Sequence, residues 1–195
     1  MASYDGFIPL GKQFRELPDP STQERYSDEQ LYALALYIYS LKPPANPHPF
    51  EAEAVQGKQI FQQQGCAACH PPPLYANNKL LPVSGFRVSE DLKTRFDVLL
   101  VPIGTDPHLT IETRRGTGFY KVPSLRGVRY RSPFEHNGSA ATLGDWFDPR
   151  RLRDDYVPTG FKGYGVKNRA IKGHEFGLKL SGNDKAALIA FLKRL

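Results

Sequence analysis

The sequence predicts a mainly α-helical fold with long ordered loops. Its 40% of hydrophobic and 24% of charged residues are typical of a globular protein. The 17 prolines and 17 glycines indicate long irregular connections and few strands. Three segments have the caps and the apolar spacing of helices, and 195 residues suffice for one domain with an extra segment at one end.

The N-terminal segment, residues 1–50, is predicted to be an arm followed by one helix. Residues 1–19 contain prolines and glycines without periodic apolar positions, which indicates an extended arm. Ser27 can cap a helix together with Gln30, three residues later. Apolar residues then recur at helical spacing until two prolines end the run: Leu31, Leu34, Ile38 and Leu41. Because this helix is apolar on almost every side, we expect another element to cover it.

Residues 51–195 are predicted to form one domain, bounded by two helices. The first helix covers residues 51–64, carries Gly57 and Phe61 on one face, and leads directly into the run CAACH. The second helix begins after Ser181, which can cap it. It has a single apolar stripe: Leu188, Phe191, Leu192 and Leu195.

Between these two helices the sequence predicts short elements joined by loops. Residues 90–100 have a helical pattern, and Ser139 can cap a short helix through SAATLGDWF. Asp148 and Pro149 should end that helix, because the residue before a proline disfavours helical backbone.

The run CAACH indicates a covalently attached haem. Two thiols at this spacing can bond the two vinyl groups of one porphyrin, and the histidine that follows can ligate its iron. Cys66 and Cys69 are therefore expected to hold one haem c, with His70 as the proximal iron ligand. These are the only 2 cysteines in the chain, so no disulfide framework competes for them.

Two other chemistries also use a CxxC pair. A zinc site would need a second, closely spaced ligand pair, and no other histidine in the chain lies next to another one. A redox-active thiol pair is usually preceded by a strand, whereas here a helix comes first. Haem attachment is the better interpretation.

The sixth iron position decides what such a haem can do. A methionine there raises the reduction potential, a second histidine lowers it, and an open position admits peroxide or dioxygen. The only methionine is Met1, which argues against a methionine ligand. His174, in a glycine-flanked loop before the last helix, is the favoured sixth ligand, and His136 is the second candidate; His48 and His108 rank below both. An open site or a tyrosine ligand stays as an alternative: Tyr75, Tyr120, Tyr130 and Tyr164.

The net charge of +6 and the pI near 9.3 could suggest nucleic acid as a partner. Many of the basic residues lie in one run with aromatic residues between Arg114 and Arg131. Beside a haem, such a run is better explained by a solvated face, by docking of a redox partner, or by neutralisation of the haem propionates. We predict that Arg126 contacts a propionate and that nucleic acid is not a partner.

The sequence also bears on location. No stretch approaches the roughly 18 consecutive apolar residues that would span a bilayer. The N-terminus lacks the basic and apolar regions of a secretory signal. Because covalent haem attachment in bacteria normally follows export, we expect a periplasmic or otherwise exported protein whose leader is absent from this sequence.

The arrangement of helices around CAACH carries a first resemblance. A glycine-bearing helix that enters the motif, together with a terminal helix carrying Phe191 and Leu192, resembles the crossed terminal helices of the class I cytochrome c fold. The resemblance implies a class I cytochrome c-like fold, although ordinary core helices would show the same pattern.

Three longer blocks carry a more specific resemblance: GCAACHPPPLYANNKL, GTGFYKVPSLRGVRYRSPFEHNGSAATLGDWFDPRRL and GHEFGLKLSGNDKAALIAFL. Together they resemble the C-terminal haem domain of the bacterial di-haem cytochrome c peroxidase superfamily, over roughly Gly57 to Leu195. The resemblance implies an electron-transfer haem at the CAACH motif, with Arg126 and His136 beside it.

The chain departs from that pattern in two respects. Only one CxxCH motif is present, so the peroxidatic haem is missing from this chain. The usual methionine ligand is also absent, as it is in relatives such as the rubber oxygenases, whose C-terminal haem looks bis-histidine. That analogy favours His174.

These inferences predict a mono-haem c-type cytochrome that transfers electrons to or from a redox partner protein. The helix that ends in LYIYSLKPP resembles the close of a preceding domain, so a second haem-bearing domain or subunit is one candidate partner. The alternative is an enzyme, a haem peroxidase or oxygenase domain with an open or weakly held distal site. A haem-based sensor or an assembly subunit is the third interpretation.

Overall fold

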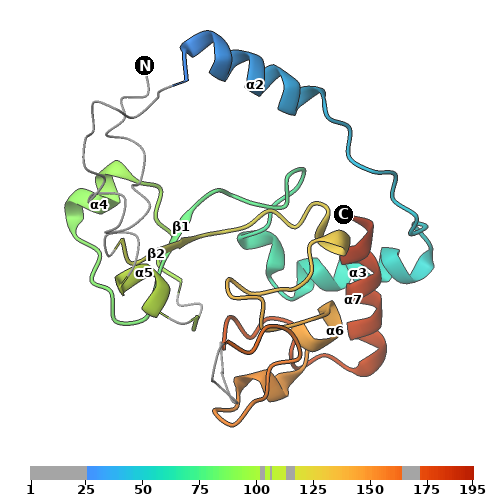
Figure 1. The fold of residues 1–195 in the computed structure, drawn as a ribbon. Helices are drawn as coiled ribbons and strands as arrows, with labels where there is room; N and C mark the ends of the chain where they lie inside the picture. The colour runs from blue at the N-terminus through green and yellow to red at the C-terminus, as the bar shows by residue number, and fades with distance from the viewer. Residues whose placement is uncertain (1–25, 102–103, 106, 113–116, 164–171) are drawn as a thin grey trace. The chain divides into compact units, whose positions relative to one another are not determined.

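The computed structural model describes residues 26–101, 104–105, 107–112, 117–163 and 172–195. The chain divides into two units, Met1–Pro47 and His48–Leu195 (Figure 1). The arm predicted for residues 1–19 lies outside the described residues. Among the described residues, no helix is long and apolar enough to cross a membrane.

The first unit contains one helix, α2 (Asp28–Ser40). It begins at the predicted cap: the Ser27 side chain accepts a hydrogen bond from the Gln30 amide, and the Gln30 side chain accepts one from the Ser27 amide. It ends where Leu41 becomes extended. No side chain of α2 is buried, and Tyr39 is 87% exposed. We expected another element to cover this apolar helix, but no element in the described part of its own unit does so.

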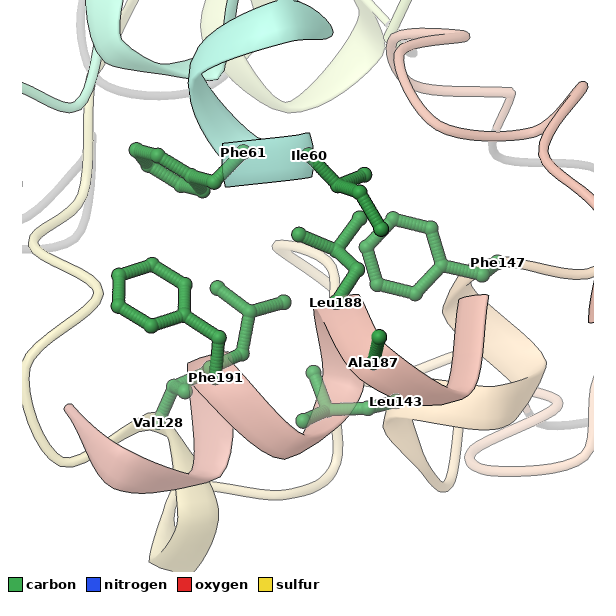
Figure 2. Packing of buried hydrophobic residues seen from close by; sticks show 9 residues of the cluster. Ile60, Phe61, Val128, Leu143, Phe147, Ala187, Leu188 and Phe191 are labelled. Atoms are coloured by element: carbon green, nitrogen blue, oxygen red, sulfur yellow. The ribbon is translucent and has the colours of Figure 1, made fainter. Parts of the chain in front are cut away.

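The core of the second unit forms where α3 (Ala52–Gln63) packs against α7 (Gly182–Arg194). Figure 2 shows Ile60 and Phe61 of α3 facing Leu188 and Phe191 of α7, as the apolar spacing predicts. The α6 region adds Leu143 and Phe147 to the same cluster, and Val128 closes it. This core is what holds the start of the CAACH segment against the last helix.

Gly57 sets how closely these two helices approach. A Cβ atom built on Gly57 would come 1.9 Å from the carbonyl oxygen of Ala187 and 2.8 Å from the Cβ of Phe191. Only a residue without a side chain can occupy such a crossing. The predicted shared face of Gly57 and Phe61 is therefore confirmed as a packing face.

The segment of the chain between α3 and α7 contains a small antiparallel sheet. Strand β1 (Leu80–Pro82) pairs with β2 (Phe119–Lys121), and Leu81 is opposite Tyr120. The helix predicted over residues 90–100 is shorter than expected: α4 covers Glu90–Arg95 after the Ser89 cap. The following residues leave the helix because Val98 forms a parallel bridge with Leu80. Sheet pairing overrides local helical preference there.

The remaining elements are single turns. They are η3 (Cys66–Ala68), α5 (His108–Glu112), η5 (Val128–Tyr130), α6 (Leu143–Trp146) and η6 (Pro149–Leu152). The cap of α6 is Thr142 rather than the predicted Ser139. Ser139 is buried instead and donates its hydroxyl to Glu135, so it is not available as a helix cap. The helix α6 ends before Asp148 and Pro149, as predicted.

Candidate haem site

The CAACH segment forms a tight turn directly after α3. Gly65, in the left-handed conformation at φ 74°, turns the chain out of the helix and into η3. The amide of His70 then donates to the carbonyl of Cys66 at 2.9 Å. Cys66 and Cys69 are both free thiols and both partly exposed. Two thiols and an imidazole on one short turn fit the attachment of a haem from one side.

The surroundings of the two thiols favour their protonated state. Burial raises the pKa of Cys66 to about 11, and burial also raises the pKa of Cys69. A redox-active cysteine needs a lowered pKa, because the thiolate is the nucleophile. Among the described residues, no group of three or more His, Cys, Asp or Glu side chains could hold a metal ion.

The His70 ring is oriented by backbone carbonyls. Its Nδ1 donates to the carbonyl oxygen of Tyr75 at 3.0 Å, which leaves Nε2 as the nitrogen without a proton. Burial lowers the pKa of His70, while hydrogen bonds to the carbonyls of Tyr75 and Pro123 oppose that shift. A neutral imidazole whose Nδ1 is held by a carbonyl is the usual state of a histidine that ligates iron.

The VPSLR block fixes the loop that carries the Tyr75 carbonyl. The amide of Leu125 donates to that same carbonyl at 3.1 Å, and the Ser124 hydroxyl donates to the carbonyl of Leu74 at 2.5 Å. Arg126 is exposed, and its Nη1 donates to the carbonyl of Pro73 at 3.2 Å. Arg126 thus lies beside the CAACH loop and binds its backbone.

His174 is half-buried in the loop before α7. Its ring lies edge-on to Trp146, with 5.1 Å between the centroids, and 5.5 Å from the ring of Phe176. Its Nδ1 is buried and has no hydrogen-bond partner among the described residues. The pKa of His174 is lowered to about 4, mainly by burial and also by the charges of Arg151 and His70. His70 and His174, although 104 positions apart, are therefore close enough to influence each other electrostatically.

Arg151 is a buried residue at this site that the sequence did not single out. Only 1% of it is exposed. Its Nε donates to the carbonyl of Trp146 at 2.7 Å, its Nη2 donates to the carbonyl of His174, and its guanidinium lies 4.4 Å from the centre of the Trp146 ring. Three arginines occur in the run DPRRLR, and only the fold distinguishes the buried one from its exposed neighbours.

His136 lies in a second polar group. Its ring stacks on Tyr120, with centroids 4.9 Å apart and planes 19° apart. The neighbouring Glu135 has a raised pKa because it is buried, although the Ser139 hydroxyl and the charge of Arg151 oppose the shift. Glu135 therefore connects the His136 segment electrostatically to Arg151.

The other candidate ligands are spread over the chain. Tyr75 packs its ring against Phe61 and Phe191, at centroid distances of 5.9 and 6.0 Å. Tyr130 is 53% exposed and lies under the guanidinium of Arg129. The remaining positions are placed as follows: His48 is half-buried at the start of the second unit, the His108 side chain lies outside the described residues, and so does Tyr164.

Comparison with known proteins adds a relationship at the level of sequence. No protein-family profile matches the chain. The chain is similar to two cytochrome-c peroxidases. Both are from Denitromonas iodatirespirans: cytochrome-c peroxidase IdrP2 is 30% identical over 71% of this chain, and cytochrome-c peroxidase IdrP1 is 26% identical over 58% of it. The chain spans 38% of the length of each of these relatives. It is therefore a distant relative of cytochrome-c peroxidases.

Proposed function

We propose that this chain is a mono-haem c-type cytochrome that transfers single electrons. Cys66 and Cys69 would hold the haem covalently, and His70 and His174 would ligate its iron on opposite faces. The haem supplies reversible one-electron chemistry, and the protein supplies orientation and burial. The observation that carries the proposal is the electrostatic proximity of two half-buried histidines from distant parts of the chain.

The states of the two histidines support their roles. Each is kept neutral by burial, which lowers its pKa. His70 is oriented through its Nδ1, while the Nδ1 of His174 has no partner among the described residues. The CAACH turn follows α3, and the His174 loop precedes α7, so the packed helix pair supports both segments. We propose that this pair is the helix crossing of a class I cytochrome c fold.

Two further contacts at the haem edge belong to this proposal. We propose that Arg126, beside the Pro73 carbonyl, reaches a haem propionate, and that His136 lies at the rim of the pocket. Replacing Arg126 by Gln should then lower the midpoint potential of the haem, because one positive charge near the iron is lost. An unchanged midpoint potential would contradict the propionate contact, and the role of Arg126 would then be limited to its hydrogen bond with the Pro73 carbonyl.

The decisive experiment is spectroscopic. The purified chain should carry the mass of one covalent haem, and its ferric form should give a low-spin electron paramagnetic resonance signal. His174→Ala should convert this signal to high spin, whereas His48→Ala, a substitution of a histidine in the linker, should not. A low-spin signal that survives in His174→Ala would remove His174 as the ligand.

The similarity to cytochrome-c peroxidases favours one alternative function. In that case the chain would be a peroxidase-related enzyme domain with an open or weakly held distal site. Turnover of hydrogen peroxide with a reduced electron donor would distinguish the two. If the chain only transfers electrons, its peroxide turnover should not exceed that of a bis-histidine cytochrome. If it is an enzyme domain, turnover should rise with the protein concentration and be blocked by cyanide.

We further propose that the redox partner is a second haem-bearing domain or subunit, docked on α2. Both α2 and α7 have 13 residues, and each follows a serine whose side chain accepts a hydrogen bond from the amide three positions later. Aligned on these caps, the buried Ala187, Leu188, Phe191 and Leu192 of α7 correspond to Ala33, Leu34, Tyr37 and Ile38 of α2. The relatives, of which this chain spans 38%, are long enough to contain another domain.

The alignment of α2 with α7 predicts the kind of element that should cover α2. In α7 the four positions pack on α3, at a crossing that requires Gly57. The same face of α2 should therefore cover a glycine-bearing helix of a second cytochrome-type unit. We also propose that this chain and its partner lie in the periplasm, where covalent haem attachment would occur.

A chimera tests the equivalence of the two helices. Residues 182–194 are replaced by the sequence of residues 28–40, and we expect the haem to attach and the domain to unfold cooperatively. The control chimera carries residues 26–38 instead, which places Leu31 where Ala187 meets Gly57, and it should fail to pack. If the two chimeras behave alike, α2 is not the counterpart of α7 and the partner proposal loses its support.

A further inference from the structure

Arg151 has an environment that its neighbours in η6 do not share. It is 1% exposed, whereas Arg150 and Arg153 are exposed and each pairs with an aspartate, Asp148 and Asp155 respectively. Burying a guanidinium is costly unless several groups compensate for its lost hydration. No carboxylate of the described residues forms an ion pair with Arg151, so its direct contacts are with backbone carbonyls and an aromatic ring. The charge of Glu135 favours the charged form of Arg151 from a greater distance, and the Nη1 of Arg151 has no hydrogen-bond partner among the described residues.

These contacts join two segments that are far apart in the sequence. The Nε of Arg151 donates to the carbonyl of Trp146, and its Nη2 donates to the carbonyl of His174, 23 positions away. The guanidinium also lies over the Trp146 ring, and the edge of this ring meets the His174 ring. Arg151 therefore holds the backbone of His174 and the ring against which its imidazole packs.

Gly173 shows how tightly this arrangement is built. A Cβ atom there would come 3.2 Å from the ring of Trp146 and 3.3 Å from Nη1 of Arg151, and the residue has a φ of +57°. The chain thus passes against the tryptophan and the guanidinium without room for a side chain immediately before His174.

We propose that Arg151 is a positioning residue for His174. Its two donors and the Trp146 ring fix the direction in which the imidazole points. The inference rests on the proposed function, in which His174 ligates the haem iron. A planar guanidinium with several fixed donors can make both carbonyl bonds and still stack on a ring, which a lysine cannot do.

A second consequence concerns the haem potential. Arg151 carries a positive charge that is shielded from water and is hydrogen-bonded to the backbone of His174. A positive charge at that depth disfavours the more positive ferric state relative to the ferrous state. Loss of Arg151 should therefore lower the midpoint potential as well as loosen the ligand.

The test compares ferric holoprotein of four variants by electron paramagnetic resonance and potentiometry. We expect Arg151→Ala to show a high-spin fraction that added imidazole returns to low spin, together with a lowered midpoint potential. Arg151→Lys should change the midpoint potential little but shift the low-spin g values, because it retains the charge and loses the planar group that makes both carbonyl bonds and stacks on the ring. Arg153→Ala, an exposed arginine two positions away, should match the wild type, and His174→Ala should be high spin.

The outcomes separate this inference from the function beneath it. If Arg151→Ala is folded, low spin and unchanged in potential while His174→Ala is high spin, the positioning role is wrong and the ligation stands. If His174→Ala stays low spin, the ligation fails and the positioning role fails with it. If circular dichroism shows that Arg151→Ala does not fold, the Arg151→Lys variant provides the test instead. Unchanged g values in Arg151→Lys would then overturn the positioning role.

Discussion

Gly57 lies against the backbone of Ala187, so that a Cβ atom on Gly57 would come within 1.9 Å of the Ala187 carbonyl oxygen. This is the point of closest approach between the two helices that make the core. Because the obstacle is backbone rather than the end of a flexible side chain, the structure can accommodate an added methyl group only by moving the helices apart.

Gly57→Ala should therefore destabilise the protein. We expect the free energy of unfolding to fall by about 2 kcal/mol or more, although alanine is the better helix former. The measurement is urea unfolding of the ferric holoprotein. Gly182→Ala is the matched control, since nothing lies within 4 Å of a Cβ at that position, and it should be neutral. Equal effects of the two substitutions would mean that the close crossing is absent.

Tyr75→Phe should leave the haem spectrum unchanged. The group of Tyr75 that acts on His70 is its backbone carbonyl, and its ring packs between Phe61 and Phe191. Removing the hydroxyl should therefore alter neither the iron ligation nor the attachment. Optical and electron paramagnetic resonance spectra of the ferric variant check this, and a change of spin state would instead point to a tyrosine ligand.

The Ser124→Ala substitution should loosen the CAACH loop without unfolding the domain. The Ser124 hydroxyl donates to the carbonyl of Leu74 and accepts from the amide of Arg126. Loss of these bonds should cost about 1 kcal/mol. Hydrogen exchange should show faster exchange for the amides of residues 74–79 than in the wild type, with α7 unaffected. Uniform acceleration over the whole domain would contradict a local role.

Stability should depend on pH through Glu135. Burial raises the pKa of Glu135 above its ordinary value of 4.5, so the folded protein holds this proton more tightly than the unfolded chain. Its contribution to stability is then complete below the ordinary pKa and is lost as the pH rises through the folded pKa. We expect the wild type to lose stability relative to Glu135→Gln as the pH rises above the ordinary pKa of 4.5. Urea unfolding across that range measures the difference, and a constant difference would contradict it.

Local signals in the sequence predicted the caps and helices well. Ser27 and Ser181 cap α2 and α7 where their spacing indicated, because a capping hydrogen bond spans only three residues. Gly57 and Phe61 were correctly placed on one face, because helical periodicity fixes faces without knowledge of the partner. The haem assignment of the CAACH motif, which uses only the residues of the motif itself, stays a prediction.

Features that depend on distant residues were wrong or missed. The helix expected over residues 90–100 stops at Arg95 because Val98 pairs with Leu80, and that pairing has no signal in the local pattern. Ser139 and Thr142 are both suitable caps by type; the contact that distinguishes them is with Glu135, only four residues before Ser139, but it requires the burial that the fold provides. Arg151 could not be separated from Arg150 and Arg153 for the same reason: burial is a property of the fold.

The packing of α3 against α7 has a consequence for the order of events when the protein is made. All of residues 64–181 separate the two helices, so a chain that emerges N-terminus first, during synthesis or export, cannot complete the cover of the apolar face of α3 until α7 has emerged. During that interval Cys66 and Cys69 lie on a segment whose final support is missing. An enzyme that attaches a porphyrin would therefore meet the two thiols on an open chain, before folding closes around the product.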